Sequence, residues 1–298
     1  MKKLLVLLLT VLMCFALAAC SSAPASSDTA PADETPVVDD NPYNLVEPGK
    51  LTVSMSTDYA PMEFFDTTKT GQDMYVGSDV ELCKFIADYL GLELVIKAQD
   101  FDTCQVSVAQ GIADMSVSGY SYTTSRAAAY LLSVDYFSDG DSGQVAIIKA
   151  GNSDKFPNLD ALNVAGVTVA AQNGALQQEI VTEQLPNATM MQVDDLNNAC
   201  DQLYEGTYDA VAIAQTTAEL LVQSHPDKFE IVNGLFDDSK YTGYHALINL
   251  ENTALCDAVN EAIGAVPAGQ YATWQADSEA LFLSLGEAAV EGIVAEAE

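Results

Sequence analysis

The chain has 298 residues, with 43 acidic and 11 basic side chains, and its formal net charge at pH 7 is −32. This charge argues against binding to nucleic acid and against electrostatic adhesion to anionic lipid. The chain is long enough for one large or two medium domains.

The N-terminus carries an export signal. Lys2 and Lys3 precede an apolar run over residues 4–18, which is shorter than the about 20 residues of a membrane-spanning helix and therefore predicts a secretory signal. The following "LAAC" resembles the lipobox of bacterial lipoproteins, whose cysteine is acylated as the signal is removed. This resemblance implies a signal peptide over 1–19 and a lipid anchor on Cys20. Ordinary cleavage after Ala19, leaving a free cysteine, is the alternative.

The next segment, residues 20–44, is rich in Ser, Ala, Pro, Asp and Thr and has almost nothing to bury. We therefore expect a flexible stalk. No later apolar stretch reaches membrane-spanning length, so the lipid anchor is the expected attachment to the cell membrane, on its extracytoplasmic side. We expect a monomer.

Strands and helices alternate along the rest of the chain. We predict, in chain order, strand 51–55, helix 78–90, strand 92–97, helix 103–110, strands 114–117, 144–149 and 167–171, helix 176–184, strand 189–193, helix 195–203, strand 210–213, helix 217–223, strand 244–249, and helices 253–263 and 271–285. Ser78 and Glu81 form a capping-box pattern, and Gly91 ends that helix. The alternation predicts α/β layers around mostly parallel sheets.

Four cysteines lie in the predicted body, namely Cys83, Cys104, Cys200 and Cys256. They are far apart, form no C-x-x-C pair and have no histidine nearby in sequence, which argues against a zinc site. Whether any of them form disulfides stays open. We expect no cofactor.

The stretch "SVSGYSYTTSR", residues 116–126, contains the only arginine of the chain. It follows a predicted strand, where open α/β sheets present their ligand sites. Gly119 allows close approach of the backbone, Ser121 offers a hydroxyl, and Thr123 is a predicted helix N-cap one turn before Arg126. A guanidinium in this setting suits a carboxylate, which it binds through two parallel hydrogen bonds. A structural ion pair between Arg126 and one of the many acids is the alternative.

Two aromatic residues follow other strands at the same expected edge. Tyr59 stands before Ala-Pro after the first strand, and Phe101 comes after the second strand. Rings so placed stack on the apolar or planar part of a ligand. The alternative, a hydrophobic plug at the base of a loop, fits Phe64 and Phe65 better.

Three segments, "STDYAPME" (56–63), "GSDVELCKFIADYLG" (77–91) and "DMSVSGYSYTTSR" (114–126), together resemble the extracytoplasmic solute-binding proteins of ABC transporters for polar amino acids, family 3. The resemblance implies a two-lobed periplasmic-binding-protein-like α/β fold of class II with a two-strand hinge. Lobe 1 would comprise 45–138 plus 241–298, and lobe 2 would comprise 139–240. The lobes would close on a small amino acid or related carboxylate and deliver it to ABC permease subunits.

The resemblance also implies roles for the residues that match. Arg126 would bind the ligand α-carboxylate, and Gly119 and Ser121 would hold the carboxylate and the ammonium through backbone and hydroxyl groups. Tyr120 belongs to the same ligand-binding stretch. Tyr59 and Phe101 would enclose the ligand side chain.

Lobe 2 departs from the family pattern. In "QNGALQQE" (172–179), Gly174 and the following helix N-terminus can still donate N–H groups to an anion, but Ala175 and Leu176 replace the usual hydroxyl residues. In "YDAVAIAQTT", Ala214 takes the place of the acid that pairs with the ligand ammonium. Gln215 or Asp58 would have to substitute for it, or the ligand lacks an α-ammonium, because an unpaired buried ammonium is costly.

Ser56 and three glutamines indicate which type of ligand side chain the protein would accept. Ser56 stands where binders of basic amino acids carry an acid, so lysine and arginine are not expected. Amide groups of Gln172, Gln177 and Gln215 would tolerate an uncharged polar or aromatic side chain.

Two rival functions remain beside transport. Some family relatives are extracytoplasmic dehydratases, and such chemistry needs a positioned acid or base. Glu63 is the candidate for it, since His225 and His245 lie in patterns that indicate structural roles. The third reading is a sensor protein that delivers its ligand to a membrane receptor. We expect binding without turnover.

Overall fold

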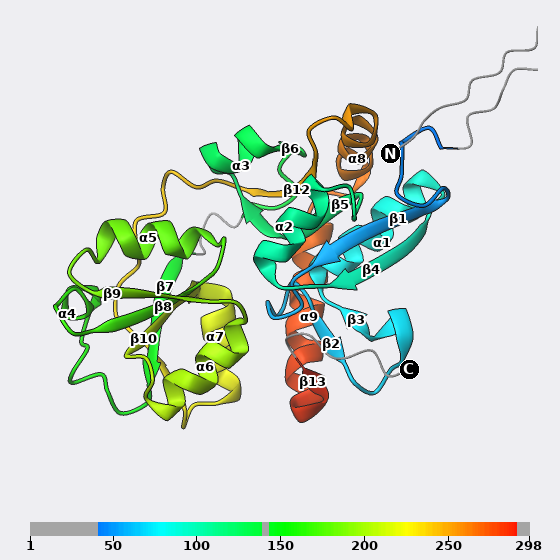
Figure 1. Cartoon of the computed structure of the whole chain (residues 1–298). Helices are drawn as coiled ribbons and strands as arrows, with labels where there is room; N and C mark the ends of the chain where they lie inside the picture. Colours follow the sequence, from blue (N-terminus) through cyan, green and yellow to red (C-terminus); the bar gives the residue numbers. More distant parts are fainter. Residues whose placement is uncertain (1–40, 139–142, 291–298) are drawn as a thin grey trace, which may run out of the picture. The chain divides into compact units, whose positions relative to one another are not determined.

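The computed structural model describes residues 41–138 and 143–290, which form two lobes (Figure 1). The predicted signal peptide, Cys20 and most of the predicted stalk lie outside these residues. At the end of the predicted stalk, the Asn41 side chain exchanges two hydrogen bonds with the backbone of Leu45.

Lobe 1 is built on a five-stranded sheet of order β4-β1-β5-β12-β6. Its strands are β1 (Lys50–Met55), β4 (Glu93–Ala98), β5 (Met115–Ser121), β6 (Tyr130–Leu132) and β12 (Tyr244–Asn249). β1 is parallel to β4 and β5, whereas β12 runs antiparallel to β5 and β6. Its helices are α1 (Ser78–Leu90), α2 (Phe101–Ala109), α3 (Thr124–Ala129), α8 (Thr253–Ala265) and α9 (Gln270–Leu285). A small sheet joins β13 (Ala289–Val290), β2 (Phe64–Asp66) and β3 (Tyr75–Val76), and single 3₁₀ turns cover Gly71–Met74 and Gly286–Ala288.

Lobe 2 is built on a second five-stranded sheet, of order β11-β7-β10-β8-β9. Its strands are β7 (Gln144–Lys149), β8 (Thr168–Gln172), β9 (Thr189–Val193), β10 (Ala210–Ala214) and β11 (Phe229–Ile231). Its helices are α4 (Leu159–Leu162), α5 (Leu176–Gln184), α6 (Leu196–Glu205) and α7 (Gln215–Ser224). β8, β9 and β10 are parallel, while β7 runs antiparallel to its two neighbours.

The lobe 2 sheet is covered by helices on both faces. Because side chains of a strand alternate between faces, Ile148 and Ile147 of β7 belong to two different hydrophobic clusters. Ile180 of α5 packs in the first cluster, and Leu203 of α6 packs in the second. This explains why β10, in the middle of the sheet, is apolar and buried over its whole length.

The capping-box prediction at the start of α1 is wrong. The N-cap residue is Gly77, and Ser78 is the first residue of the helix. The Ser78 hydroxyl donates to the hydroxyl of Tyr271 in α9, at 3.2 Å, so a tertiary contact replaces the local one. The prediction for the other end is confirmed, because Gly91 caps the helix in the left-handed conformation with φ of 69°.

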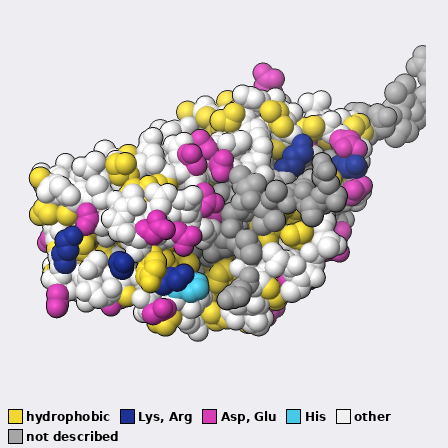
Figure 2. Space-filling model, turned by 60° about the horizontal axis from the view of Figure 1, so that its bottom comes forward, with side chains coloured by type: hydrophobic (Ala, Val, Ile, Leu, Met, Phe, Trp, Pro, Cys, Tyr) yellow, Lys and Arg dark blue, Asp and Glu magenta, His cyan; other side chains and the backbone are white. Residues whose placement is uncertain are grey.

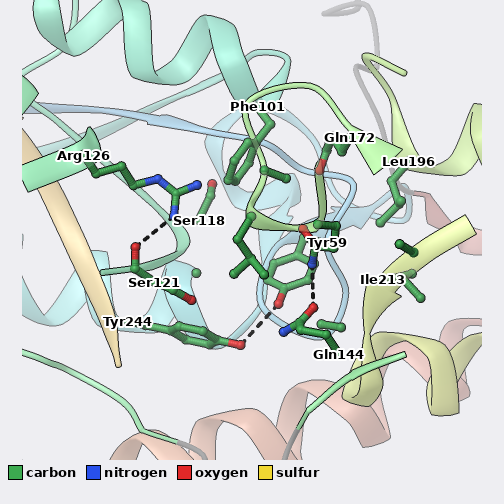
Figure 3. Close-up of a pocket in the computed structure, with 16 residues that line it drawn as sticks. Tyr59, Phe101, Ser118, Ser121, Arg126, Gln144, Gln172, Leu196, Ile213 and Tyr244 are labelled. Atoms are coloured by element: carbon green, nitrogen blue, oxygen red, sulfur yellow. Dashed lines mark hydrogen bonds between the residues drawn. The ribbon is translucent and has the colours of Figure 1, made fainter. Parts of the chain in front are cut away.

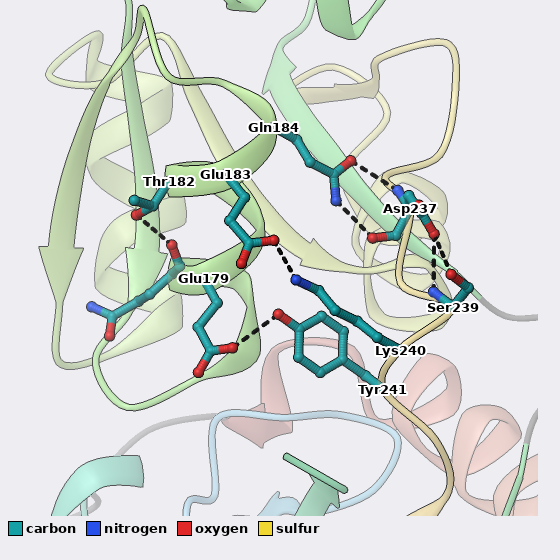
Figure 4. Close-up of polar contacts among 9 residues, drawn as sticks. Glu179, Thr182, Glu183, Gln184, Asp237, Ser239, Lys240 and Tyr241 are labelled. Atoms are coloured by element: carbon teal, nitrogen blue, oxygen red, sulfur yellow. Dashed lines mark hydrogen bonds and ion pairs between the residues drawn. The ribbon is translucent and has the colours of Figure 1, made fainter. Parts of the chain in front are cut away.

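The chain returns from lobe 2 to lobe 1 through the segment before β12 (Figure 4). Gln184 of α5 donates to the backbone oxygen of Asp237 at 2.6 Å and accepts from its N–H at 2.9 Å. The oxygen of Thr242, in contrast, accepts from the N–H of Tyr122 in lobe 1, at 3.0 Å. Further contacts to α5 join Lys240 to Glu183 and Tyr241 to Glu179. The crossing between the lobes therefore falls near residues 241 and 242.

Acidic side chains are spread over the face shown in Figure 2, with lysines among them. Within residues 41–138 and 143–290, no helix is both long and apolar enough to cross a membrane. The same residues contain no cluster of three or more side chains suited to hold a metal ion. The four cysteines whose pairing stayed open, Cys83, Cys104, Cys200 and Cys256, are all buried free thiols.

Candidate functional site

A pocket is lined by residues of both lobes (Figure 3). The lining residues of lobe 1 are Tyr59, Phe101, Ser118, Gly119, Ser121, Arg126 and Tyr244. Those of lobe 2 are Gln144, Gln172, Ala175, Leu176, Gln177, Leu196, Ala212, Ile213 and Ala214. Arg126 points toward the pocket from one side, and Leu196 and Ile213 lie on the other. Gln172 and Gln144 also lie toward this second side, so the pocket has a charged end at Arg126 and an uncharged end of mixed apolar and amide groups.

Arg126 is held at the start of α3. Thr123 is the N-cap residue, as predicted, and its hydroxyl accepts the N–H of Arg126 at 3.1 Å. The guanidinium donates to the backbone oxygens of Ser121, at 2.9 Å, and Gly174, at 3.1 Å, and thus links the two lobes. The Phe101 ring lies 5.7 Å from its central carbon.

The guanidinium is buried without an acidic partner. Arg126 is 5% exposed, and burial lowers the pKa of its guanidinium below the ordinary value. The alternative of a structural ion pair finds no support in the described part of the chain, where the ion pairs are all made by lysines. An arginine stays charged under these conditions. The described lining of the pocket therefore presents a positive charge that forms no ion pair, although the charge of Glu179, outside this lining, acts on it.

Gly119 brings the backbone of β5 close to Tyr59. Its φ is +56°, and a Cβ atom there would lie 2.7 Å from Cε1 of the Tyr59 ring. Glycine is thus required both by the backbone conformation and by the space. The N–H of Gly119 donates to the carboxylate of Asp79 at 3.0 Å and is not directed to a ligand. The hydroxyls of Tyr59 and Tyr244 lie 3.3 Å apart.

The prediction that Tyr120 belongs to the pocket is corrected. β5 continues through Ser121 instead of ending at Val117, so successive side chains point to opposite faces. Ser121 lines the pocket, whereas Tyr120 is fully buried behind it. The ring of Tyr120 packs 4.9 Å from that of Phe101, and its hydroxyl lies 2.8 Å from that of Ser116.

Two predicted residues of lobe 2 also lie outside the lining. Gly174 donates its N–H to the Gln178 side chain at 3.1 Å. Gln215 lies beyond the strand end, where its amide accepts from Gly143 N at 3.3 Å and donates to Glu219 at 2.7 Å. The preceding residue, Ala214, is the one that faces the pocket. Ala175 and Leu176 line it as the sequence predicts.

Asp58 was a candidate partner for a ligand ammonium, but both of its carboxylate oxygens are engaged. One accepts from the Ser56 hydroxyl at 2.6 Å, and the other accepts from Gln172 Nε2 at 2.7 Å and from Leu196 N at 2.8 Å. Burial raises the pKa of Asp58 to about 6. Its contacts with Gln172 and Leu196 make it a second link between the lobes.

A pair of buried carboxyl groups, Glu63 and Asp79, lies in lobe 1 near Gly119. Asp79 accepts from the hydroxyls of Tyr271 and Tyr136 as well as from Gly119. Both oxygens of Glu63 are buried, and no hydrogen bond within the usual geometric limits joins them to the residues that the structure describes; burial together with the charge of Asp79 raises the pKa of Glu63 well above its ordinary value. Glu63 is fully buried and does not line the pocket, so it is not positioned against a ligand.

Some lining residues were missed by sequence reasoning. Gln144 and Tyr244 begin strands that were predicted with the observed bounds, so a search for side chains at strand ends would have found them. Leu196 and Ile213 carry no local signal that separates them from core residues.

The chain is similar to known binding proteins. The profile of the bacterial extracellular solute-binding proteins, family 3, matches residues 51–276. The arginine-binding extracellular protein ArtP of Bacillus subtilis is 28% identical over 231 residues, which is 76% of this chain and 78% of that protein. A cyclohexadienyl dehydratase of Pseudomonas aeruginosa is 24% identical over 183 residues, which is 61% of this chain and 66% of that protein.

Solved structures agree with these similarities. An amino acid ABC transporter substrate-binding protein from Streptococcus pneumoniae, bound to L-arginine, superposes with a TM-score of 0.71 at 26% identity, covering 78% of this chain and 94% of that one. The predicted two-lobed α/β fold of class II, with mostly parallel sheets, is thereby confirmed. Because the family profile covers most of the described chain, the protein belongs to the bacterial extracellular solute-binding proteins, family 3.

Proposed function

We propose that this protein is the lipid-anchored solute-binding component of an ABC importer and holds a small amino acid or related carboxylate between its two lobes. The observation that carries the proposal is the buried guanidinium of Arg126, which has no acidic partner in the described chain and lies in a pocket lined by both lobes. In this role Arg126 binds the ligand carboxylate, and Tyr59 and Phe101 enclose the ligand body.

The relatives support the class of function more strongly than the ligand. ArtP and the Streptococcus protein are described as binding arginine, whose side chain is a cation. The pocket lining of this chain offers no carboxylate among the described residues to pair with such a side chain. We therefore do not propose arginine as its ligand.

The test of the proposal is Arg126→Ala. A guanidinium makes two charge-assisted hydrogen bonds to a carboxylate, each worth about 1.5–3 kcal/mol, so affinity should fall at least about a hundredfold. The ligand is found by a thermal-shift screen of amino acids and small carboxylates, and affinities are measured by calorimetry. Lys84→Ala, which removes a charge from the exposed surface of α1, is the matched control and should bind as the unmodified protein does.

Arg126 also bonds to two backbone oxygens, so the fold of the variant is checked by circular dichroism and urea unfolding without ligand. Arg126→Lys provides a second measurement, because lysine keeps the charge and loses the two parallel donors. Affinities of both variants within threefold of the unmodified protein would contradict the role of Arg126.

Catalysis is the rival function, since a dehydratase is among the relatives. The lining residues within the described chain include no carboxylate and no imidazole, which are the usual general acids and bases. We therefore propose binding without turnover. Mass spectrometry of ligand released after long incubation should show intact ligand, and loss of water from it would favour the dehydratase reading.

Export and anchoring rest on the N-terminal sequence. Cys20→Ala should release the protein from the membrane fraction and abolish incorporation of labelled fatty acid, and retention of the label would place the anchor elsewhere. Genes for an ABC permease and ATPase beside this one would support import over delivery to a sensor.

A further inference from the structure

We infer that the ligand is a small carboxylate whose body carries no ammonium or other positive charge, such as a 2-oxo acid or a simple aryl or alkyl carboxylate. This inference rests on the proposed binding function and specifies its substrate class. It follows from the charges and apolar surfaces that the two lobes bring together, and it differs from the ligands for which the relatives are named.

Arg126 is the one charged side chain among the described residues that line the pocket, and it lacks an acidic partner there. Arg126 uses two of its five N–H donors on backbone oxygens, which leaves three for an anion. Arg126 is 5% exposed, and it forms no ion pair with any of residues 41–138 and 143–290. A buried charge without a partner is costly. A bound carboxylate therefore removes this cost and leaves the pocket neutral.

A bound α-amino acid would give the pocket a different net charge. Its ammonium and carboxylate cancel each other, so the lining of the closed pocket would retain the positive charge of Arg126, while the carboxylate of Asp58 lies outside this lining and is engaged by Ser56, Gln172 and Leu196. The lining residues of the described chain offer the ammonium only neutral acceptors, such as the hydroxyls of Ser121, Tyr59 and Tyr244. Neutral acceptors satisfy the N–H groups but do not compensate the charge, and the nearby guanidinium repels it.

The buried carboxylates of Asp58 and Asp79 in lobe 1 are not available to pair with a ligand ammonium. Asp58 is outside the lining, and its oxygens accept from Ser56, Gln172 and the N–H that begins α6. Asp79 is also outside the lining and accepts from Gly119, Tyr136 and Tyr271. Redirecting either group to a ligand would leave several of these buried donors without acceptors, which costs about 1–3 kcal/mol each.

The side of the pocket opposite Arg126 suits an uncharged body. Leu196 and Ile213 lie there together with the uncharged amides of Gln172 and Gln144, while the ring of Phe101 lies beside the guanidinium (Figure 3). Ala214 occupies the end of β10, where a short side chain faces the same space. Apolar walls favour an apolar or planar ligand body and disfavour a second charge.

The experiment compares each of the nineteen amino acids that have a primary α-amino group with the corresponding 2-oxo acid, which differs only at the α-carbon. Dissociation constants are measured by calorimetry after a thermal-shift screen at pH 7. The tightest ligand should be a 2-oxo acid that binds at least tenfold better than its amino acid. If the tightest ligand is an amino acid, the inference is overturned and the proposed function stands. If no member of this panel and no other small carboxylate of the thermal-shift screen binds, the proposed function is contradicted together with the inference.

A variant tests the charge balance directly. Ala214 is the N-cap residue of α7, a position that favours aspartate. Ala214→Asp adds a carboxylate to the lining. The variant should therefore bind each amino acid more tightly than the corresponding 2-oxo acid. Gln215→Asp adds the same charge one residue later, outside the lining, and should leave the preference unchanged. An Ala214→Asp protein that folds and keeps the preference for 2-oxo acids would overturn the argument from charge balance.

Discussion

Asp58 offers a direct test of how the buried charges affect stability. Replacement by asparagine keeps the size of the side chain and removes the charge. The asparagine oxygen can accept from Gln172 and from the N–H of Leu196, as the carboxylate does, and its amide can donate to the Ser56 hydroxyl. Asp58→Asn therefore changes the charge while preserving the number of hydrogen bonds.

The expected effect follows from the pKa of Asp58, which burial raises from 3.8 to about 6. Between these values the folded state binds a proton that the unfolded state has released, so the free energy of unfolding falls as pH rises through this range. Each pKa unit corresponds to about 1.4 kcal/mol, so the unmodified protein loses about 3 kcal/mol through this group between about pH 4 and pH 7. The asparagine variant does not lose this stability, because its side chain does not ionise.

The assay is urea unfolding of both proteins at several pH values from 4 to 7.5, without ligand. The variant should be about as stable as the unmodified protein at pH 4 and more stable by about 3 kcal/mol at pH 7. Asp73→Asn, which removes a carboxylate from an exposed position, is the matched control. Parallel curves for Asp58→Asn and the unmodified protein would refute the reasoning, because they would show that Asp58 does not titrate in this range.

Three further predictions concern the fold around the site. Gly119→Ala should destabilise the protein by more than about 1 kcal/mol in urea unfolding, because the added Cβ meets the Tyr59 ring at a positive φ; a loss below about 0.5 kcal/mol would contradict this. Gln184→Ala should cost about 1–3 kcal/mol, since it removes both side-chain hydrogen bonds to Asp237 in the segment that returns to lobe 1; an unchanged unfolding midpoint would count against that contact. A reducing agent should leave the thermal midpoint unchanged, because the four described cysteines are free, and a downward shift would reveal a disulfide.

The sequence predicted the long elements of this fold well. Helix α1, helix α5 and strands β7, β9 and β12 have the predicted bounds, because each combines a clear periodicity with local start or stop signals. The short strands β2, β3, β6, β11 and β13 were not predicted. A strand of two or three residues has too little sequence pattern of its own and depends on its partner strand. The capping box at Ser78 failed for the same reason, since Tyr271 provides the competing partner from 193 residues away.

The sequence by itself was enough to identify the family, and it predicted an export signal and the half of the candidate site around Arg126. That half is local, because Thr123, Arg126 and Ser121 lie within a few residues and position one another directly. Only the tertiary structure decided which lobe 2 residues face the guanidinium and that Tyr120 lies behind the pocket. It also decided that Asp58 bonds to Gln172 and Leu196, which are 114 and 138 residues away, instead of remaining available to a ligand. Such contacts depend on how two separately folded sheets meet, and no local pattern of hydrophobic and polar residues encodes that geometry.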